Sequence, residues 1–419
     1  MTGVRRTLWL ILSMLSAVSM WYYVANVWSV GQPTQFSDLY ARWWGAHEVL
    51  LHRRDPYSPA VTREIQIVIY GAPVASEHPG DAAELAGGFA YPVYVVFLMW
   101  PTVHWTFPVA RDLFLCVFVA VTLASLLLWL YWLRWRPPAA TLSVLAVFTF
   151  ASFPVLQGLK LENLSLLVAF LVAATMASLV AEHFAMGGLL LASATIKPQF
   201  VLLLIPWLAV WTIGNWPRRR GLAWSFSAAL AVLMLGGEVI APGWVSRFLT
   251  VARAYRRYTY GHSLLDVWFS PRVGPIVAAV LVLVVLAVCW KLRSCPAQSS
   301  GFFLVSCWVL AATLVVIPTL EPHAQLLLLP GFLFLLRNGG RIWRAGKMAR
   351  LLLTGAWVLL GWAWVAALGM MLAAIWLPAV TVRRWWELPL YPSPLIPFGI
   401  FIIFGFLLAK ESNHPLLAV

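Results

Sequence analysis

The sequence predicts an all-α polytopic membrane protein. Of its 419 residues 62% are hydrophobic and only 11% charged, whereas soluble proteins have about 45–50% apolar and about 25% charged residues. The mean hydropathy is +0.84. A chain of this composition cannot cover a water-soluble fold with polar surface, which excludes soluble, fibrous and disordered classes. We expect one integral membrane domain over residues 1–419.

Apolar stretches near the length of a membrane-spanning helix recur along the whole chain. We interpret 184–213 as two short spans separated at Lys197-Pro198, and 91–107 as a segment at the outer interface, which gives about twelve spans. The stretches are 8–30, 109–133, 139–156, 163–181, 184–213, 221–241, 273–294, 301–317, 322–337, 351–378 and 394–409.

The basic residues fix the expected orientation. With these spans, fifteen Lys and Arg but only two acids, Glu182 and Glu411, fall on one side of the membrane. Lys and Arg are concentrated in cytoplasmic loops, so both termini are expected in the cytoplasm of a bacterial-type cell with a plasma membrane. The formal charge of +14 is therefore a topology signal and does not indicate nucleic-acid binding. Residues 31–107 and 242–272 form the two large outer loops.

The first outer loop contains a predicted amphipathic helix at 38–53 that lies on the membrane surface. Its apolar face is formed by Leu39, Trp43, Ala46 and Leu50. Asp38 occupies the N-cap position, and Asp55-Pro56-Tyr57 forms the turn that ends the helix. Two interpretations of Asp38 are open: a helix cap, or a carboxylate that faces a functional cavity.

Two groups of cations stand out on the outer side. Lys197 has apolar neighbours and a proline directly after it, so it either extends to the interface or lines a cavity as the partner of an anionic group. Arg253, Arg256 and Arg257 oppose the charge bias, so they bind either phosphate or the anionic headgroups of membrane lipids. His262 follows them.

Further polar candidates lie at span ends. His323 follows Glu321-Pro322 and is either a structural hydrogen-bonding residue or a substrate ligand. Gln157 and Asn163 either cap helices or bind a polyhydroxylated ligand. The chain has no Walker loop, dinucleotide fingerprint, HExxH motif, nucleophile elbow or outer DxD pair. We therefore expect no metal and no cofactor.

The order of several motifs resembles glycosyltransferase family 87, the DUF2029-type enzymes of the GT-C superfamily that use polyprenyl-phosphate hexoses. The resemblance covers nearly the whole chain. The second proline of the family's Tyr-Pro-Pro is Val93 here. The motifs are Phe36-Ser37-Asp38-Leu39-Tyr40, Asp55-Pro56-Tyr57, Tyr91-Pro92, Gln157 through Asn163, Ile196-Lys197-Pro198-Gln199 and His323.

The resemblance implies a GT-C fold with its active site on the outer, non-cytoplasmic face. Asp38 would be the general base for transfer of a hexose, with mannose the best-known donor sugar, from a lipid-linked donor to a lipid or polymer acceptor with inversion. Lys197 and one or more of Arg253, Arg256 and Arg257 would neutralise the donor phosphate. The other expected substrate-binding residues are Asp55, Gln157, Asn163, His262 and His323.

A transporter or flippase of lipid-linked saccharides is the alternative function. Such a protein would also need a cationic, aromatic-lined outer cavity. Transporters, however, commonly carry internal repeats and paired broken helices, and we find one broken segment and no repeat in the sequence.

Overall fold

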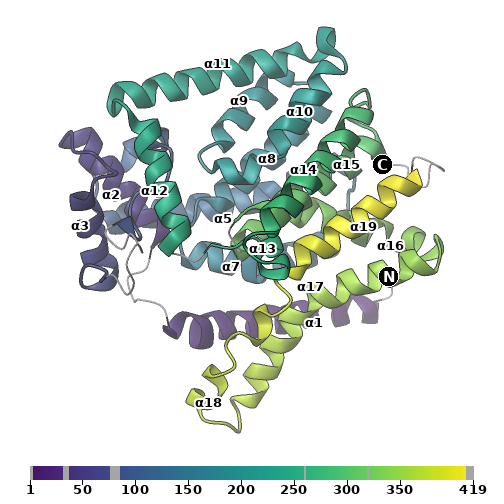
Figure 1. The fold of residues 1–419 in the computed structure, drawn as a ribbon. Helices are drawn as coiled ribbons and strands as arrows, with labels where there is room; N and C mark the ends of the chain where they lie inside the picture. The colour runs from purple at the N-terminus through teal and green to yellow at the C-terminus, as the bar shows by residue number, and fades with distance from the viewer. Residues whose placement is uncertain (1–2, 32–36, 76–84, 259–260, 319–320, 412–419) are drawn as a thin grey trace.

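The computed structural model describes residues 3–31, 37–75, 85–258, 261–318 and 321–411, and every regular element of these residues is helical. Figure 1 shows the helices gathered in one assembly, with α2, α3 and α12 on one flank. The all-α class predicted from the sequence is confirmed.

The first helix leads into residues 31–107, the predicted outer loop, called the outer segment below. The end of the helix passes through a π-helix, η1, and a 3-10 turn, η2, before the short helical elements of the outer segment. Their bounds are α1 (Gly3–Tyr23), η1 (Val24–Trp28), η2 (Ser29–Gly31), α2 (Asp38–Leu51), α3 (Pro59–Tyr70), η4 (Val93–Val95), α4 (Val96–Met99) and η5 (Trp100–Thr102).

The remaining helices form the apolar body of the protein. They are α5 (Phe107–Trp132), α6 (Ala139–Phe150), α7 (Phe153–Lys160), α8 (Ser165–Val180), α9 (Phe184–Ala194), η6 (Pro198–Val201), α10 (Leu204–Ile213), α11 (Trp216–Ile240), α12 (Trp244–Tyr258), α13 (Leu264–Phe269), α14 (Gly274–Lys291), α15 (Ser300–Val316), η7 (Pro322–Leu328), α16 (Leu329–Arg344), α17 (Lys347–Ala373), α18 (Ala379–Arg383), η8 (Leu388–Leu390) and α19 (Leu395–Glu411).

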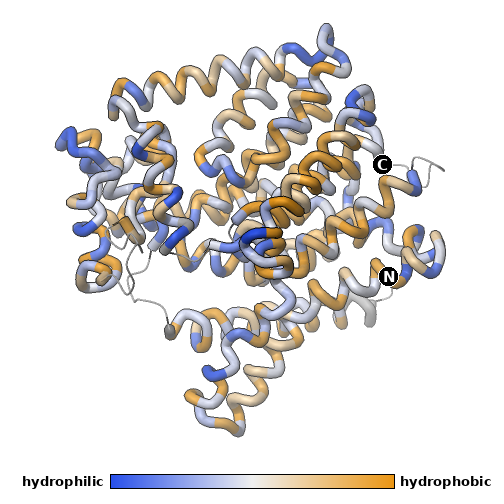
Figure 2. The backbone as a smooth tube through the Cα atoms, in the orientation of Figure 1, coloured by the Kyte–Doolittle hydropathy of each residue, from blue (hydrophilic) through white to orange (hydrophobic). Residues whose placement is uncertain are grey.

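The long apolar helices confirm a multi-pass membrane protein. Six helical stretches of the described residues are long and apolar enough to cross a membrane, and the bent pair α6 and α7 would be a seventh; α8, α9, α10 and α15 are apolar but shorter. In Figure 2 the backbone of α14 is coloured as hydrophobic over most of its length. On α11 the side chains of Val232, Leu235 and Val239 are largely exposed, as expected for a helix that contacts acyl chains instead of water.

Two of the predicted apolar stretches are interrupted. The stretch 184–213 divides into α9, η6 and α10 at Lys197-Pro198, as the sequence indicates. The stretch 139–156, predicted as one span, is α6 followed by α7 with a bend of 55°. Pro154 stands in the first turn of α7, where its missing N–H is tolerated, and the turn before it breaks the preceding helix.

Helix α2 does not lie on the surface as an amphipathic membrane helix. Its predicted apolar face packs inside the protein: Leu39 and Ala46 are fully buried and Trp43 is 5% exposed. The Trp43 indole donates a hydrogen bond to the Thr102 carbonyl at 3.1 Å, and Tyr40 meets Phe107 edge to face. The periodicity predicted the helix correctly, but the face that was expected to contact lipid contacts the segment 93–107 instead.

The two ends of the helical body differ in chemistry. At one end Arg219 donates to the carbonyls of Trp211 and Arg293 at 2.6 and 2.8 Å, and Arg218 pairs with Glu182 at 2.6 Å. Glu182 follows α8 and Arg293 follows α14, while Trp211 is in the last turn of α10 and the two arginines are in the first turn of α11. This end of the helices is rich in basic residues. The break after α9 and the start of α8 lie at the opposite end of the same helices, where the polar site is found.

Helices α9 and α11 approach closely at Gly188. A Cβ atom at this position would lie 2.5 Å from the Leu222 carbonyl oxygen and 2.7 Å from the Phe226 backbone nitrogen. Both are backbone atoms that cannot rotate away, so only glycine allows this contact, as is common where membrane helices pack.

Gly188→Ala is therefore expected to destabilise the protein by about 1–3 kcal/mol through overpacking. Gly355→Ala is the matched control, because Gly355 also lies within a helix and a Cβ there meets open space. Thermal unfolding in nanodiscs would measure both. An equal melting temperature for the two variants would contradict the close packing.

Candidate functional site

One asparagine connects the two predicted reactive groups of the outer face. Asn163 Nδ2 donates to Asp38 Oδ2 at 2.5 Å. Asn163 Oδ1 accepts from Lys197 Nζ at 3.0 Å and from Ser165 Oγ at 2.6 Å. A single side-chain amide therefore separates the Asp38 carboxylate at the start of α2 from the Lys197 ammonium in the break between α9 and η6.

The Lys197 side chain is buried, with 3% of the residue exposed. Its Nζ donates to Ser165 Oγ at 2.7 Å and lies 3.4 Å from Glu321 Oε2. The ammonium also lies over the rings of Phe200 and Tyr91, at 4.6 and 5.8 Å from their centroids. A buried ammonium needs such partners, so Lys197 does not reach to the interface.

Glu321 and His323 form the far side of this cluster. His323 Nε2 lies 2.9 Å from Glu321 Oε2, and the His323 backbone N–H donates to Gln157 Oε1 at 3.1 Å. Burial by itself would raise the pKa of the Glu321 carboxyl, but Lys197 and His323 hold that pKa well below its ordinary value. Glu321 is thus the carboxylate that compensates the buried lysine.

The start of α2 positions Asp38. Ser37, and not Asp38, is the N-cap: its Oγ accepts from the Tyr40 N–H at 3.0 Å. The expectation that Asp38 caps the helix is therefore wrong. Asp38 is the first helical residue, its N–H donates to the Leu161 carbonyl at 2.8 Å, and its side chain remains 21% exposed. The carboxylate is consequently free of the capping role and accessible from outside.

The turn between α7 and α8 presents Asn163 to Asp38. The Asn163 N–H returns to the Gly158 carbonyl and the Glu162 N–H to the Leu159 carbonyl, a Schellman motif. Glu162 takes the left-handed position at φ 54°, which glycine or asparagine would adopt at lower cost. Its carboxylate bonds to the Ser37 hydroxyl. Burial raises the pKa of the Glu162 carboxyl, and the Ser37 hydrogen bond partly offsets that rise.

Arg42 is a member of the cluster that sequence reasoning missed. Its guanidinium lies 4.3 Å from the Tyr91 ring centroid, 3.6 Å from Asp38 Oδ1, and donates to the Asp38 carbonyl at 2.6 Å. The spacing of four residues from Asp38 is the signal that could have identified it. Arg42 brings a second cation to the Asp38 side of the site.

Other predicted site residues lie outside this cluster. Asp55 pairs with Arg247 of α12 at 2.9 Å and so attaches the outer segment to that helix, and its Oδ1 accepts from the Tyr57 N–H in the turn before α3. The side chain of Arg256 is outside the described residues, as is Phe36. Three further candidates, Arg253, Arg257 and His262, have exposed side chains.

A cavity of about 190 Å³ opens beside the cluster. Glu321 and Gln325 supply polar groups to its wall, and Leu314, Ile317 and Pro397 supply apolar ones. Ligand pockets for drug-sized molecules are larger, about 300–1,000 Å³. The cavity is thus large enough for only a small part of a lipid-linked ligand.

Groups that could ligate a metal lie at the other end of α2. The ligand atoms of His47, Glu48 and His52 come within 4.8 Å of one another. The carboxylates of the cluster described above are engaged with Asn163, Ser37 and Lys197.

Comparison of the chain with protein-family models, curated proteins and solved structures finds no match.

The buried Lys197–Glu321 pair is expected to be strongly coupled. Removing one partner, with Lys197→Met or Glu321→Gln, leaves an uncompensated buried charge and should cost about 3–5 kcal/mol of stability. The double variant should lose less stability than the sum of the losses of the two single variants. Unfolding of the four proteins in detergent would give the coupling energy.

The exposed Arg218–Glu182 pair provides the matched control, because its side chains are 60% and 44% exposed. A double-mutant cycle there should give a small coupling. Equal coupling in the two cycles would contradict the structural role assigned to Lys197.

Proposed function

We propose that the protein is a membrane glycosyltransferase that moves a hexose from a polyprenyl-phosphate donor to an acceptor hydroxyl, with Asp38 as the general base. The observation that carries the proposal is the Asp38–Asn163–Lys197 connection, which places an accessible carboxylate one amide away from a buried cation. The resemblance to glycosyltransferase family 87 assigns Asp38 the same role.

The carboxylate meets the requirements of a base. Asn163 orients Oδ2, and each carboxylate oxygen retains lone pairs for a further hydrogen bond. The acceptor hydroxyl would bind against Asp38 on its exposed side. As the acceptor oxygen attacks the anomeric carbon, its proton passes to the carboxylate.

The cations suit a phosphate leaving group. When the new glycosidic bond forms, the bond from the anomeric carbon to the phosphate oxygen breaks and the electron pair leaves with the polyprenyl phosphate. Arg42 and Lys197 both lie close to the Tyr91 ring, at 4.3 and 5.8 Å from its centroid, and their charge would stabilise the phosphate as it gains negative charge. Direct displacement needs one base and inverts the anomeric centre.

The site would face the non-cytoplasmic side of a GT-C-like fold of about twelve spans, with both termini in the cytoplasm. The separation of the basic end from the Asp38 end of the helices supports this orientation, because Lys and Arg are concentrated on the cytoplasmic side. A lipid-linked donor would then reach the site from the outer leaflet. Arg253, Arg256 and Arg257 on the neighbouring α12 would contact its phosphate or lipid headgroups.

Asp38→Asn and Asp38→Ala are expected to lower transfer by about 10²–10⁴-fold, the usual contribution of a general base. The measurement is transfer of radiolabelled hexose from polyprenyl phosphate by protein in nanodiscs, with extracted membrane lipids as acceptors. Asp112→Asn is the matched control, because the Asp112 side chain is 68% exposed and pairs with its neighbour Arg111. Melting temperatures check that each variant folds.

Full turnover by a folded Asp38→Ala protein would overturn the assignment. Equal donor binding by wild type and Asp38→Ala, with no transfer by either, would instead favour a transporter or flippase of lipid-linked saccharides.

A further inference from the structure

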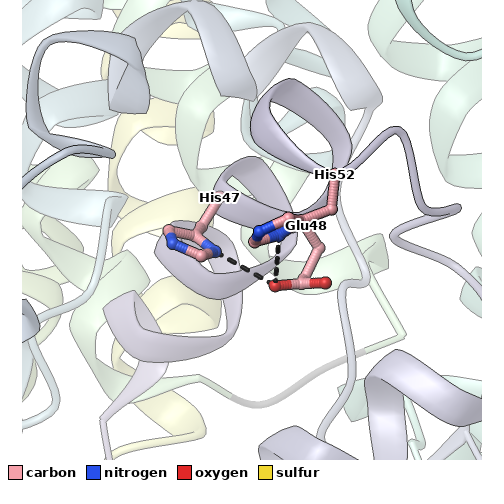
Figure 3. Close-up of side chains that lie close together, drawn as sticks. All are labelled: His47, Glu48 and His52. Atoms are coloured by element: carbon pink, nitrogen blue, oxygen red, sulfur yellow. Dashed lines mark hydrogen bonds and ion pairs between the residues drawn. The ribbon is translucent and has the colours of Figure 1, made fainter.

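Three potential metal ligands converge at the C-terminal end of α2 (Figure 3). His47 Nδ1 lies 3.0 Å from Glu48 Oε1, and His52 Nδ1 lies 3.1 Å from the same oxygen. In Figure 3 both imidazole rings turn a nitrogen toward that carboxylate oxygen. The two nitrogens and the oxygen lie within 4.8 Å of one another.

The helix and its neighbours fix these side chains. Glu48 and His52 are four residues apart and lie on one face of the helix. His47 directly precedes Glu48, and its ring stacks on Trp44 at 5.0 Å between centroids with an interplanar angle of 9°. The ring also contacts Trp43 at 5.6 Å. The stacked contact with Trp44 and the tilted contact with Trp43 restrict the rotation of the His47 ring, whose Nδ1 lies next to Glu48.

A second layer of contacts orients the carboxylate. Arg54 Nη1 donates to Glu48 Oε2 at 2.6 Å, and Arg54 Nη2 donates to Glu64 Oε1 at 2.5 Å. Glu48 is 2% exposed. Arg54 therefore holds one carboxylate oxygen and leaves Oε1 facing the two histidines, in the way that outer groups commonly orient the ligands of a metal.

The donor set and its spacing suit a divalent transition metal. Imidazole nitrogens with one carboxylate oxygen are ligands that Zn²⁺ takes, often with a water in the fourth position. For bonds of about 2.0–2.1 Å at tetrahedral angles, donor atoms stand roughly 3.3 Å apart. The observed 3.0 and 3.1 Å require only a small widening. The His52 side chain is 53% exposed, which leaves a path for the ion and a water.

We propose that His47, Glu48 and His52 bind one divalent transition-metal ion, Zn²⁺ above all, and that this ion is structural. Ten helical residues separate Asp38 from Glu48, about 15 Å along the axis, which is too far for the ion to act on the reacting groups. Bound there, the ion would fix the last turn of α2, while Arg54 and Glu64 extend this attachment to α3.

The test uses full-length protein in nanodiscs, purified without a polyhistidine tag and stripped with a chelator. Zn²⁺ binding is measured by titration calorimetry and metal analysis, and Co²⁺ binding by its visible absorption. We expect one saturable site per chain. Because loss of even an outer-shell partner costs 10–100-fold in metal affinity, His52→Asn should weaken binding at least about tenfold. Zn²⁺ should raise the melting temperature of the wild type but not that of His52→Asn.

His104→Asn is the matched control, because His104 is an exposed histidine of the same outer segment and should bind like the wild type. The measurements do not depend on glycosyl transfer, so they stand whether or not the proposed function is correct. No saturable binding of Zn²⁺ or Co²⁺ by the wild type, or equal binding by His52→Asn, would mean that the three side chains form only a hydrogen-bonded group, and the proposal would be overturned.

Discussion

The burial of the Lys197 ammonium is the constraint around which the candidate site is arranged. An unpaired ammonium in an apolar interior costs several kcal/mol, so the fold has to supply partners from every side. Asn163 and Ser165 come from the start of α8, Glu321 from the loop after α15, and the ring faces from Tyr91 and Phe200. Asn163 then transmits this arrangement to Asp38, so the position of the proposed base depends on the lysine.

Much of the fold follows from apolar periodicity and from two prolines. Proline cannot continue a helix, so Lys197-Pro198 correctly predicted the break between α9 and α10. Pro154 likewise indicates a helix break. The bend between α6 and α7 was nevertheless not predicted, because the stretch 139–156 has no long polar run that would mark a turn. Helix α2 was predicted, but its surroundings were not, since an apolar face looks the same whether lipid or protein covers it.

The sequence predicted which residues belong to the candidate site better than it predicted the contacts between them. Asp38, Lys197 and Asn163 attract attention because polar groups beside apolar spans are costly, and the structure gathers them. Arg42 lies four residues after Asp38, and that spacing is enough to predict their pairing. Its contact with the Tyr91 ring does not follow from the spacing, because Tyr91 is distant in the chain. The sequence predicted Asp38 as the N-cap, whereas the structure has Ser37 there. Both residue types cap helices, so the sequence does not tell at which of the two the helix begins.

The hydrogen bonds of the cluster join segments that are distant in the chain. Asp38 and Asn163 are 125 residues apart, and Lys197 and Glu321 are 124 apart. During synthesis, the lysine is therefore inserted long before its compensating carboxylate has left the ribosome. A chain that ends before Glu321 would carry an uncompensated charge among apolar helices, and such an intermediate is a natural target for membrane chaperones and proteases. The cluster around Lys197 can thus be completed only after the chain has been synthesised through Glu321, the residue before the ninth apolar stretch.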